Sequence, residues 1–393
     1  MMQTNRKLRM GMLGGSTDAF IGAIHRNAAL MDGEIELVCG AFSSSHEKSI
    51  ATGKDLYLPE NRVYASYEKM IAAEKKLDPE IRMDFVAIVS PNYLHFPQAK
   101  LTLENGFHVI CDKPMTLNLK EAKELVRIVE QTGLEFALTH NYTGYPMVKQ
   151  AREMVYKGSL GKIRKIVVEY SQGFLYELIE DFGNGKSFWR ADPEKGGDTL
   201  TMGDIGTHAE NLAEYITGLK PEEVLAELGP IVPGRKMDDD VNILLRYKNN
   251  ARGVFVISQA STGEENNLKI KIYGEKAGIE WAQMEPNSLK LMWANKPVEI
   301  LRAGNNMPGL SEITRANCRL PGGHPEGFIE AFANLYRNFA RSIRIRMDGK
   351  MPDHAKKDFP DVYDGLRGMA FIKTVFESAK NNGKWVSLKS LGV

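Results

Sequence analysis

Asp204 and His208 have the side-chain types needed to remove a proton from an alcohol, and they lie four residues apart. On a helix this spacing puts both side chains on one face. A carboxylate beside an imidazole raises the basicity of the ring and fixes its orientation, so the pair could act as a general base. The spacing also permits two other roles for His208: a metal ligand paired with Asp204, or a hydrogen-bonded histidine of the core.

Lys113 is the second candidate, because it stands between Asp112 and Pro114 after an apolar run that ends at Cys111. A lysine that is followed by proline at a strand end is held in place, and its ammonium can donate a hydrogen bond to a substrate oxygen. A surface lysine before a turn would have the same neighbours. Which of these roles applies to each residue therefore depends on the strands and helices that position Lys113, Asp204 and His208.

Short apolar runs alternate with helical patterns over the first 141 residues. The runs cover residues 8–13, 34–42, 85–89, 108–111 and 135–138. The clearest helix spans residues 119–131, with Asn118 and Glu121 placed as a capping box and Gly133 as the C-terminal cap. This alternation predicts a parallel sheet covered on both faces, which binds its ligand at the carboxyl ends of the strands, where Lys113 lies.

A glycine-rich turn follows the first of these runs. Gly14 and Gly15 form it, Phe20 and Ile21 begin the next helix, and Gly22 comes directly after them. Such a turn lets the backbone approach a pyrophosphate, whose charge sits at the helix N-terminus. The turn departs from G-x-G-x-x-G, because serine takes the third position and the last glycine is delayed. A plain loop is the alternative, but the placement favours a dinucleotide site, and we expect a Rossmann domain over residues 1–141.

The end of the second run bears on the choice between NAD and NADP. An acidic residue that binds the adenine ribose is expected there, but no acid occurs before Glu47. Ser43 and Ser44 could bind either a ribose hydroxyl or a 2′-phosphate. These residues therefore leave the choice between NAD and NADP open.

Residues 142–393 follow a different pattern. Strand-like runs cover residues 163–170, 224–228, 241–247, 253–258, 268–273 and 279–282, with short turns between several of them, and helices are expected over 326–346 and 360–381. Sequential strands with short turns predict an α+β domain with an open, mostly antiparallel sheet. The run 241–247 is apolar nearly throughout, which indicates that both faces of the sheet are covered, and so we expect a homodimer or homotetramer.

Composition excludes several classes of protein. The 393 residues suffice for two domains, and 51 basic against 50 acidic residues argue against a nucleic-acid partner. Three scattered cysteines argue against a disulfide framework or a structural zinc site and favour the cytoplasm. No third ligand stands near Asp204 and His208, so no metal is expected. No apolar run approaches a membrane span, and the basic first ten residues lack the apolar stretch of a signal peptide.

Two motifs together resemble a known family. Asp112-Lys113-Pro114 is similar to the E/D-K-P signature of the glucose–fructose oxidoreductase/inositol dehydrogenase/MocA (Gfo/Idh/MocA) family, and Asp204 with His208 is similar to its D-x-x-x-H signature. Gly196-Gly197 is also typical, and the resemblance extends from Leu8 to about Trp385. It implies an NAD(P)-dependent dehydrogenase that acts on a secondary hydroxyl of a sugar, anhydrosugar or inositol.

The resemblance also implies roles for single residues. Lys113 would polarise the reacting hydroxyl, His208 would remove its proton as hydride leaves the same carbon, and Asp204 would bind a neighbouring hydroxyl. The implied cofactor contacts are Gly14, Gly15, Phe20, Ile21, Ser43, Ser44, Ser90, Pro91, Asn92, His95, Asp112, Lys113, Pro114, Asn141, Trp189 and Arg190. The expected substrate contacts are Lys113, Tyr142, Asp204, His208, Asn211 and His324.

Several features bear on the substrate. Tyr145, Tyr176 and Trp189 could offer aromatic faces to a sugar ring or could simply be core residues, and His324 could reach substrate or cap the helix that follows it. The segments 15–22 and 140–146 are similar to the branch that contains levoglucosan dehydrogenase, which implies oxidation at a pyranose C3 hydroxyl with NAD. Two other functions stay open: a glycoside hydrolase that retains NAD and oxidises its substrate transiently, and a non-catalytic sugar sensor, against which the intact Lys113, Asp204 and His208 weigh.

Overall fold

The computed structural model describes residues 6–180, 189–353 and 357–388. It divides the chain into two compact units. The first comprises Met1–Asn141 and Phe328–Leu366, and the second comprises Tyr142–Gly327 and Arg367–Val393. Residues 328–366, which the expected division at residue 141 assigned to the second domain, therefore lie in the first unit.

The first unit contains a five-stranded sheet in which every pairing is parallel. Its strands are β1 (Leu8–Gly14), β2 (Ile35–Ala41), β3 (Phe85–Val89), β4 (His108–Cys111) and β5 (Phe136–Leu138), in the order β2-β1-β3-β4-β5. This confirms the predicted parallel sheet. After β1 the chain adds β2 on one side of it, and β3, β4 and β5 then follow on the other side. The crevice at such a switch point, here between β1 and β3, is where open α/β sheets bind ligands.

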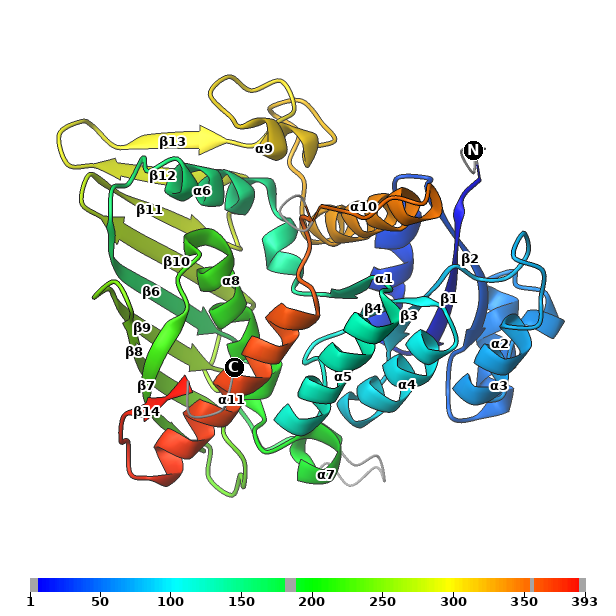
Figure 1. Cartoon of the computed structure of the whole chain (residues 1–393). Coiled ribbons are helices and arrows are strands. Elements are labelled where there is room, and N and C mark those ends of the chain that lie inside the picture. Colours follow the sequence, from blue (N-terminus) through cyan, green and yellow to red (C-terminus); the bar gives the residue numbers. More distant parts are fainter. Residues whose placement is uncertain (1–5, 181–188, 354–356, 389–393) are drawn as a thin grey trace. The chain divides into compact units, whose positions relative to one another are not determined.

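Helices cover both faces of this sheet (Figure 1). One face carries α1 (Phe20–Leu30) and α10 (Phe328–Met347), and the other carries α4 (Asn92–Glu104) and α5 (Leu119–Thr132). Two shorter helices, α2 (His46–Asp55) and α3 (Tyr67–Glu74), and a 3-10 turn, η1 (Glu60–Arg62), lie between β2 and β3 in the chain. The predicted caps of α5 are confirmed: the Asn118 side chain accepts a hydrogen bond from the Glu121 N–H, and Gly133 has a φ of 65°.

Helix α10 belongs to the core of the first unit because its apolar face packs on the sheet and on α1. Phe339 contacts Phe85 of β3 edge to face, with ring centroids 5.4 Å apart. Tyr336 and Phe332 surround His25 of α1. The buried residues that α10 contributes to this core are Phe332, Ala333, Leu335, Tyr336, Phe339, Ala340 and Ile343.

The second unit contains a nine-stranded sheet in the order β13-β12-β11-β10-β6-β9-β8-β7-β14. Its strands are β6 (Ile163–Ser171), β7 (Pro221–Gly229), β8 (Asp240–Tyr247), β9 (Arg252–Ser258), β10 (Asn267–Gly274), β11 (Ala277–Ala282), β12 (Ser288–Trp293), β13 (Glu299–Arg302) and β14 (Val386–Ser387). Among the described strands, β6 and β9 pair in parallel and the other neighbours pair antiparallel. The predicted open, mostly antiparallel sheet is confirmed.

One face of this sheet is covered within the unit. Helices α6 (Pro146–Tyr156) and α8 (Thr207–Thr217) lie along it, as does the part of α11 (Val362–Lys380) that belongs to this unit (Figure 1). Phe371 of α11 packs on Phe255 of β9. Short segments complete the unit: η3 (Trp189–Ala191), α7 (Pro193–Gly196), the π-helical turn η4 (Met202–Gly206) and α9 (Glu312–Ala316).

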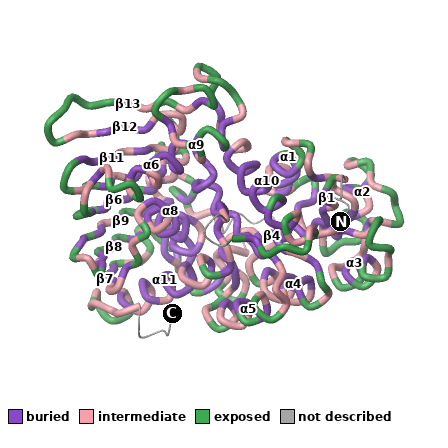
Figure 2. The backbone as a smooth tube through the Cα atoms, turned by 45° about the horizontal axis from the view of Figure 1, so that its top comes forward, coloured by how far each residue is buried: buried purple, intermediate pink, exposed green. Residues whose placement is uncertain are grey.

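The other face of the sheet is open within the described chain. Burial alternates along β8, so that Val241, Ile243 and Leu245 are buried while Leu244 is 45% exposed. Figure 2 shows the same alternation of buried and less buried residues along the strands. The register places Leu225, Leu244, Val254 and Val167 side by side across β7, β8, β9 and β6. A contiguous apolar row therefore lies on the open face.

Candidate active site

The glycine turn after β1 is closed by contact between two glycines that are seven residues apart. Gly14 and Gly15 have φ values of 79° and 71°, which L side chains rarely adopt. A Cβ atom on Gly22 would lie 2.4 Å from the Cα of Gly15. Gly22 therefore supplies the close helix–strand approach that the third glycine of the usual motif supplies. No side chain caps the start of α1, and its first turn has no acidic residue, which suits an anion at this helix terminus.

Gly22→Val is expected to weaken NADH binding at least tenfold, because the new side chain meets the Gly15 backbone and displaces α1 from the turn. The dissociation constant for NADH, measured by fluorescence titration, checks this. Asn27→Val places the same β-branched residue at an exposed position of the same helix and should leave the dissociation constant within about twofold. Equal NADH affinity in both variants would contradict the assignment of the turn.

Lys113 lies in a loop that is tied to its neighbours through backbone and side-chain hydrogen bonds. The Asp112 carboxylate accepts from the Lys113 N–H (2.8 Å) and from the Thr139 hydroxyl (2.9 Å). The two ring nitrogens of His95 lie 2.7 Å from the Pro114 carbonyl oxygen and 2.8 Å from the Ser90 carbonyl oxygen. His95 is buried, so it links the loop after β3 to the loop after β4, and its predicted contact with the cofactor stays a prediction.

His140 is a neighbour of Lys113 that the sequence analysis did not single out. Burial, together with the positive charge of Lys113, lowers the pKa of His140 to about 3, and the negative charge of Asp112 only partly opposes this. His140 is therefore neutral at physiological pH. Its place after β5, where strand ends of a parallel sheet gather, is the signal that could have identified it.

The other predicted cofactor residues of the first unit surround the same strand ends. Ser90 donates to Gln98 Oε1 (2.7 Å), and Pro91 and Asn92 begin α4. The Ser43 hydroxyl oxygen accepts from the Ser45 N–H (3.2 Å). Ser44 and Phe20 are exposed, and Ile21 packs against the core.

Asn141, which follows β5 closely, is 3% exposed, and its buried amide nitrogen has no hydrogen-bond partner among the described residues. A buried donor without a partner is costly, so a ligand oxygen suits this position. Together with the uncapped start of α1 and the Gly15–Gly22 contact, this shows that the residues present fit a dinucleotide.

Asp204 and His208 lie on consecutive helical segments of the second unit. Asp204 is in the π-helical turn η4, and His208 is in the first turn of α8. The backbone is thus helical at both residues, but a π turn replaces the regular α-helical ladder at Asp204, as is frequent at functional sites. Buried Asp238 holds the start of this turn, since its carboxylate accepts from the N–H groups of Leu200 (2.6 Å) and Met202 (2.8 Å). Burial raises the pKa of Asp238.

The Asp204 carboxylate begins a chain of hydrogen bonds. Gln259 donates through Nε2 to Asp204 Oδ2 and to Gln172 Oε1, at 2.9 Å in each case. Gln172 in turn donates to Asn266 Oδ1 (2.8 Å). Arg190 lies 3.9 Å from Asp204 Oδ1 and stacks on the Trp189 ring. Asp204 is thus joined to three side-chain amides and a cation.

A triangle of hydroxyls and amide lies at the other end of this chain. The Tyr142 and Tyr170 hydroxyls are 2.6 Å apart, and both contact Asn266. The Tyr142 ring meets the His208 ring edge to face, with centroids 4.8 Å apart. Burial raises the pKa of Tyr142 and, more strongly, that of Tyr170, so both phenols stay protonated near neutral pH. The sequence analysis missed four residues of this network: Gln259, Gln172, Asn266 and Tyr170.

The remaining predicted residues of the second unit differ in their surroundings. Asn211 is 4% exposed, and its buried Oδ1 has no hydrogen-bond partner within the part of the chain that the structure describes, so it suits a ligand hydroxyl. Tyr145 packs on Trp281 in the core and offers no open face. Tyr176 is exposed. His324 is exposed, with Nδ1 3.3 Å from the Pro321 carbonyl oxygen, and its predicted contact with substrate stays a prediction.

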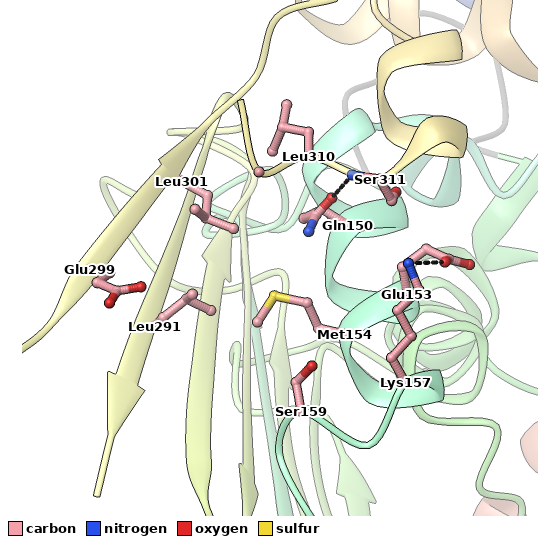
Figure 3. A pocket seen from close by; sticks show the side chains of 11 residues that line it. Gln150, Glu153, Met154, Lys157, Ser159, Leu291, Glu299, Leu301, Leu310 and Ser311 are labelled. Atoms are coloured by element: carbon pink, nitrogen blue, oxygen red, sulfur yellow. Dashed lines mark hydrogen bonds and ion pairs between the residues drawn. The ribbon is translucent and has the colours of Figure 1, made fainter. Parts of the chain in front are cut away.

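A separate cavity of about 350 Å³ lies in the second unit between α6, β12, β13 and the loop before α9 (Figure 3). Its walls are partly apolar, and Gln150 at its edge accepts from the Ser311 N–H (2.9 Å). None of the predicted site residues lines it. Its lining residues are Gln150, Glu153, Met154, Lys157, Ser159, Leu291, Glu299, Leu301, Gly309, Leu310 and Ser311.

Within residues 6–180, 189–353 and 357–388, no three His, Cys, Asp or Glu side chains gather as a metal site requires. Cys39, Cys111 and Cys318 are buried free thiols. No helix among the described residues combines the length and the apolarity that crossing a membrane requires.

Known proteins match the sequence of both units. A family model described as "Oxidoreductase family, NAD-binding Rossmann fold" matches residues 8–151, and the "GFO/IDH/MocA C-terminal domain" matches residues 148–280. The uncharacterised oxidoreductase YfiI of Bacillus subtilis is 32% identical over 390 residues, which is 98% of this chain and 98% of that protein. Levoglucosan dehydrogenase of Pseudarthrobacter phenanthrenivorans is 25% identical over 241 residues, which is 56% of this chain and 60% of that enzyme.

Solved structures give the same result. An inositol dehydrogenase homologue from Azotobacter vinelandii, complexed with NAD+, matches with a TM-score of 0.92 and 31% identity, over 98% of both chains. The same homologue complexed with NADH and myo-inositol matches with a TM-score of 0.90 and 30% identity, again over 98% of both chains. The parallel sheet, the glycine turn and both motifs thus have one explanation: the chain belongs to the GFO/IDH/MocA family of oxidoreductases and carries an NAD-binding Rossmann domain.

Proposed function

We propose that this protein is an NAD-dependent dehydrogenase that oxidises a secondary hydroxyl of a cyclitol or sugar. The observation that carries the proposal is the set of uncharged hydrogen-bonding side chains beside Asp204 and His208. Gln172 and Asn266 join Asp204, through Gln259, to the tyrosine that contacts His208. A polyhydroxylated, uncharged substrate matches such a set, because each of its hydroxyls both donates and accepts.

The proposed roles follow from the residue types. Lys113 donates to the reacting hydroxyl oxygen and stabilises the charge that develops there. His208 takes the hydroxyl proton, and the ring of Tyr142 against its edge holds the imidazole in place. Asp204 accepts from a neighbouring hydroxyl, and Asn211 offers a buried acceptor one turn beyond His208. NAD+, when bound, supplies the acceptor for the hydride that leaves the carbinol carbon.

A cyclitol is the substrate class that the relatives favour. The homologue whose structure contains myo-inositol is 30% identical over 98% of the chain, whereas levoglucosan dehydrogenase is only 20% identical over 97% of the chain in the structural comparison and aligns by sequence over 56% of it. We therefore place inositols before anhydrosugars, which reverses the order that segments 15–22 and 140–146 suggested. The buried free thiols are compatible with the reducing cytoplasm, where we propose that the enzyme acts.

The test is a panel of inositols, monosaccharides and levoglucosan, each incubated with NAD+ or NADP+ while the formation of reduced cofactor is followed. We expect steady NADH formation with at least one inositol, and a lower rate with NADP+. An NAD-retaining hydrolase would instead release the leaving group of an aryl glycoside without net NADH, and a sensor would bind a polyol without turnover. Either of these results would replace the dehydrogenase proposal.

We also propose that the protein is a homo-oligomer that pairs through the open face of the nine-stranded sheet. The apolar row across β7, β8, β9 and β6 is continued on β10, β11 and β12 by Lys271, Glu280 and Lys290, which form ion pairs. A second copy supplies the same apolar row, which neither copy covers by itself. This fits a self-complementary contact between two copies.

Leu244→Asp is expected to reduce the oligomer to a smaller species, because it places a charge in the middle of the apolar row. Sedimentation velocity measures the change. Leu320→Asp replaces a leucine of similar exposure (43%), outside the sheet, and should leave the assembly intact. A wild-type protein that sediments as a monomer would remove the proposal.

A further inference from the structure

Gln259 is a fully enclosed amide at the end of β9, and each of its polar atoms has a specific partner. Its exposed fraction is 1%. Its Oε1 accepts from the Thr201 hydroxyl (2.8 Å), and its Nε2 donates to Asp204 and to Gln172. Because a buried amide group without a partner is costly, this arrangement allows Gln259 little freedom to rotate.

The direction of these hydrogen bonds follows from the carboxylate. An ionised Asp204 can only accept, so the Gln259 amide must turn its NH₂ group toward Asp204 and its oxygen toward Thr201. The same NH₂ group faces Gln172 Oε1, which turns the Gln172 amide so that its own NH₂ group donates to Asn266. One carboxylate charge therefore sets the direction of the whole chain.

Thr201 is itself fixed in place. It is fully buried, its N–H donates to the Asp238 carbonyl oxygen (3.3 Å), and the Asp238 carboxylate holds the N–H groups on either side of it. The Thr201 hydroxyl is thus a rigid donor placed three residues before Asp204. Because the Thr201 hydroxyl binds Gln259 Oε1, the NH₂ group of Gln259 is held in one position.

From this geometry we infer that Gln259 is a positioning residue, which holds the Asp204 carboxylate in its charged form and in one orientation, with Thr201 as its anchor. The inference rests on the proposed function only for the reaction in which Asp204 takes part. The Gln259 N–H favours the charged form because it donates to Oδ2, and a proton on Asp204 would have to sit on Oδ1, which faces the Arg190 cation.

The groups that act on Asp204 come from several elements. Arg190 of η3 approaches it to 3.9 Å, and His208 follows it on α8. Tyr142 and Tyr170 are close enough for the Asp204 charge to raise the pKa of both phenols. None of these groups changes when Gln259 is replaced, so a shift in the titration of Asp204 reports the loss of its amide donor.

Gln259→Leu and Gln259→Glu test the inference. Two groups must lose a proton for activity, the base His208 and Asp204, so the kcat/KM–pH profile should have two acidic limbs. In the leucine variant, the acidic limb at lower pH, which reports Asp204, should move up by roughly one unit because the charged form loses its donor. In the glutamate variant it should move further, because two carboxyls then share a proton. Thr201→Val keeps Gln259 but removes the hydroxyl that donates to its Oε1. This variant should give a smaller shift in the same direction.

Gln150→Leu is the matched control, because Gln150 is also a buried amide of the second unit whose Oε1 accepts from two donors. It should lower the melting temperature without moving the acidic limb that reports Asp204. A drop in kcat/KM that is equal at every pH in the Gln259 variants would mean that Gln259 only maintains the fold, and would overturn the inference.

Titration of ¹³C-labelled aspartate carboxyls by NMR gives a measurement that needs no substrate, with Asp204→Asn to assign the resonance. We expect the Asp204 midpoint to rise in Gln259→Leu and to stay constant in Gln150→Leu. If the wild type oxidises no polyol but the midpoint rises, the proposed function fails and the role of Gln259 stands. If the wild type is active but the midpoint is unchanged, the role of Gln259 fails.

Discussion

Lys113→Met is expected to lower kcat/KM for the polyol substrate by roughly a thousandfold, while the affinity for NADH stays within a few-fold of wild type. In the proposed reaction the ammonium is the donor to the oxygen on which charge develops, and removal of such a donor costs two to three orders of magnitude in rate. Methionine keeps the length and apolar stem of lysine. The side-chain bond from Thr139 to Asp112 does not involve the ammonium, so the loop should keep its position.

Steady-state kinetics with the substrate found in the panel measures this effect, and fluorescence titration measures NADH binding. Lys120→Met, at an exposed position of α5, is the control and should retain wild-type rates. Lys113→Arg should not restore activity, because a planar guanidinium cannot replace a compact ammonium at a fitted site. If Lys113→Met keeps more than a tenth of the wild-type kcat/KM, another group must polarise the hydroxyl.

Arg235→Met is expected to destabilise the second unit by about 3–5 kcal/mol, the usual cost of breaking a buried ion pair on one side. The Arg235 and Asp239 side chains are both fully buried, and Nη1 lies 2.8 Å from the carboxylate. Arg235 also donates to the carbonyl oxygens of Leu175 and Glu177, at 2.7 Å in each case. Without the guanidinium, the Asp239 carboxylate still accepts from two backbone N–H groups, but the positive charge that paired with it is gone.

Urea unfolding followed by tryptophan fluorescence measures this loss, because all four tryptophans, Trp189, Trp281, Trp293 and Trp385, belong to the second unit. Arg164→Met is the matched control. Its ion pair with Glu275 spans 3.7 Å, the two side chains are 67% and 43% exposed, and its loss should change the free energy of unfolding by less than about 1 kcal/mol. Equal losses in the two variants would show that burial does not strengthen the Arg235 pair.

The sequence predicted those parts of the fold that depend on local pattern. The five parallel strands follow from short apolar runs that close on polar residues, and the caps of α5 follow from Asn118 and Gly133. β12 and β13 were missed, although β12 alternates buried and less buried residues; β13 is short and mostly exposed, so it carries little hydrophobic signal. The packing of α10 in the first unit was also missed, because an amphipathic helix does not reveal which sheet it covers.

The residues of the candidate site also fall into two groups, those that the sequence indicated and those that only the structure revealed. Lys113, Asp204 and His208 could be found because their residue types and spacing indicate chemistry. Gln259 and Asn266 could not, because an amide has no distinctive spacing and these two meet Asp204 and Tyr142 only through the register of β6, β9 and β10. Gly22 was noticed as a delayed glycine, but its purpose became clear only from its contact with Gly15.

The place of α10 has a consequence for biosynthesis. Its buried aromatic residues complete the core around β1 and β3, yet they are encoded after nearly all of the second unit. A nascent chain that has emerged only as far as Asn141 has the whole parallel sheet but leaves the surface under α10 uncovered. The nucleotide-binding unit therefore cannot finish folding on the ribosome before the nine-stranded sheet of the second unit has been synthesised, and an isolated fragment that stops at Asn141 would expose this apolar surface to aggregation.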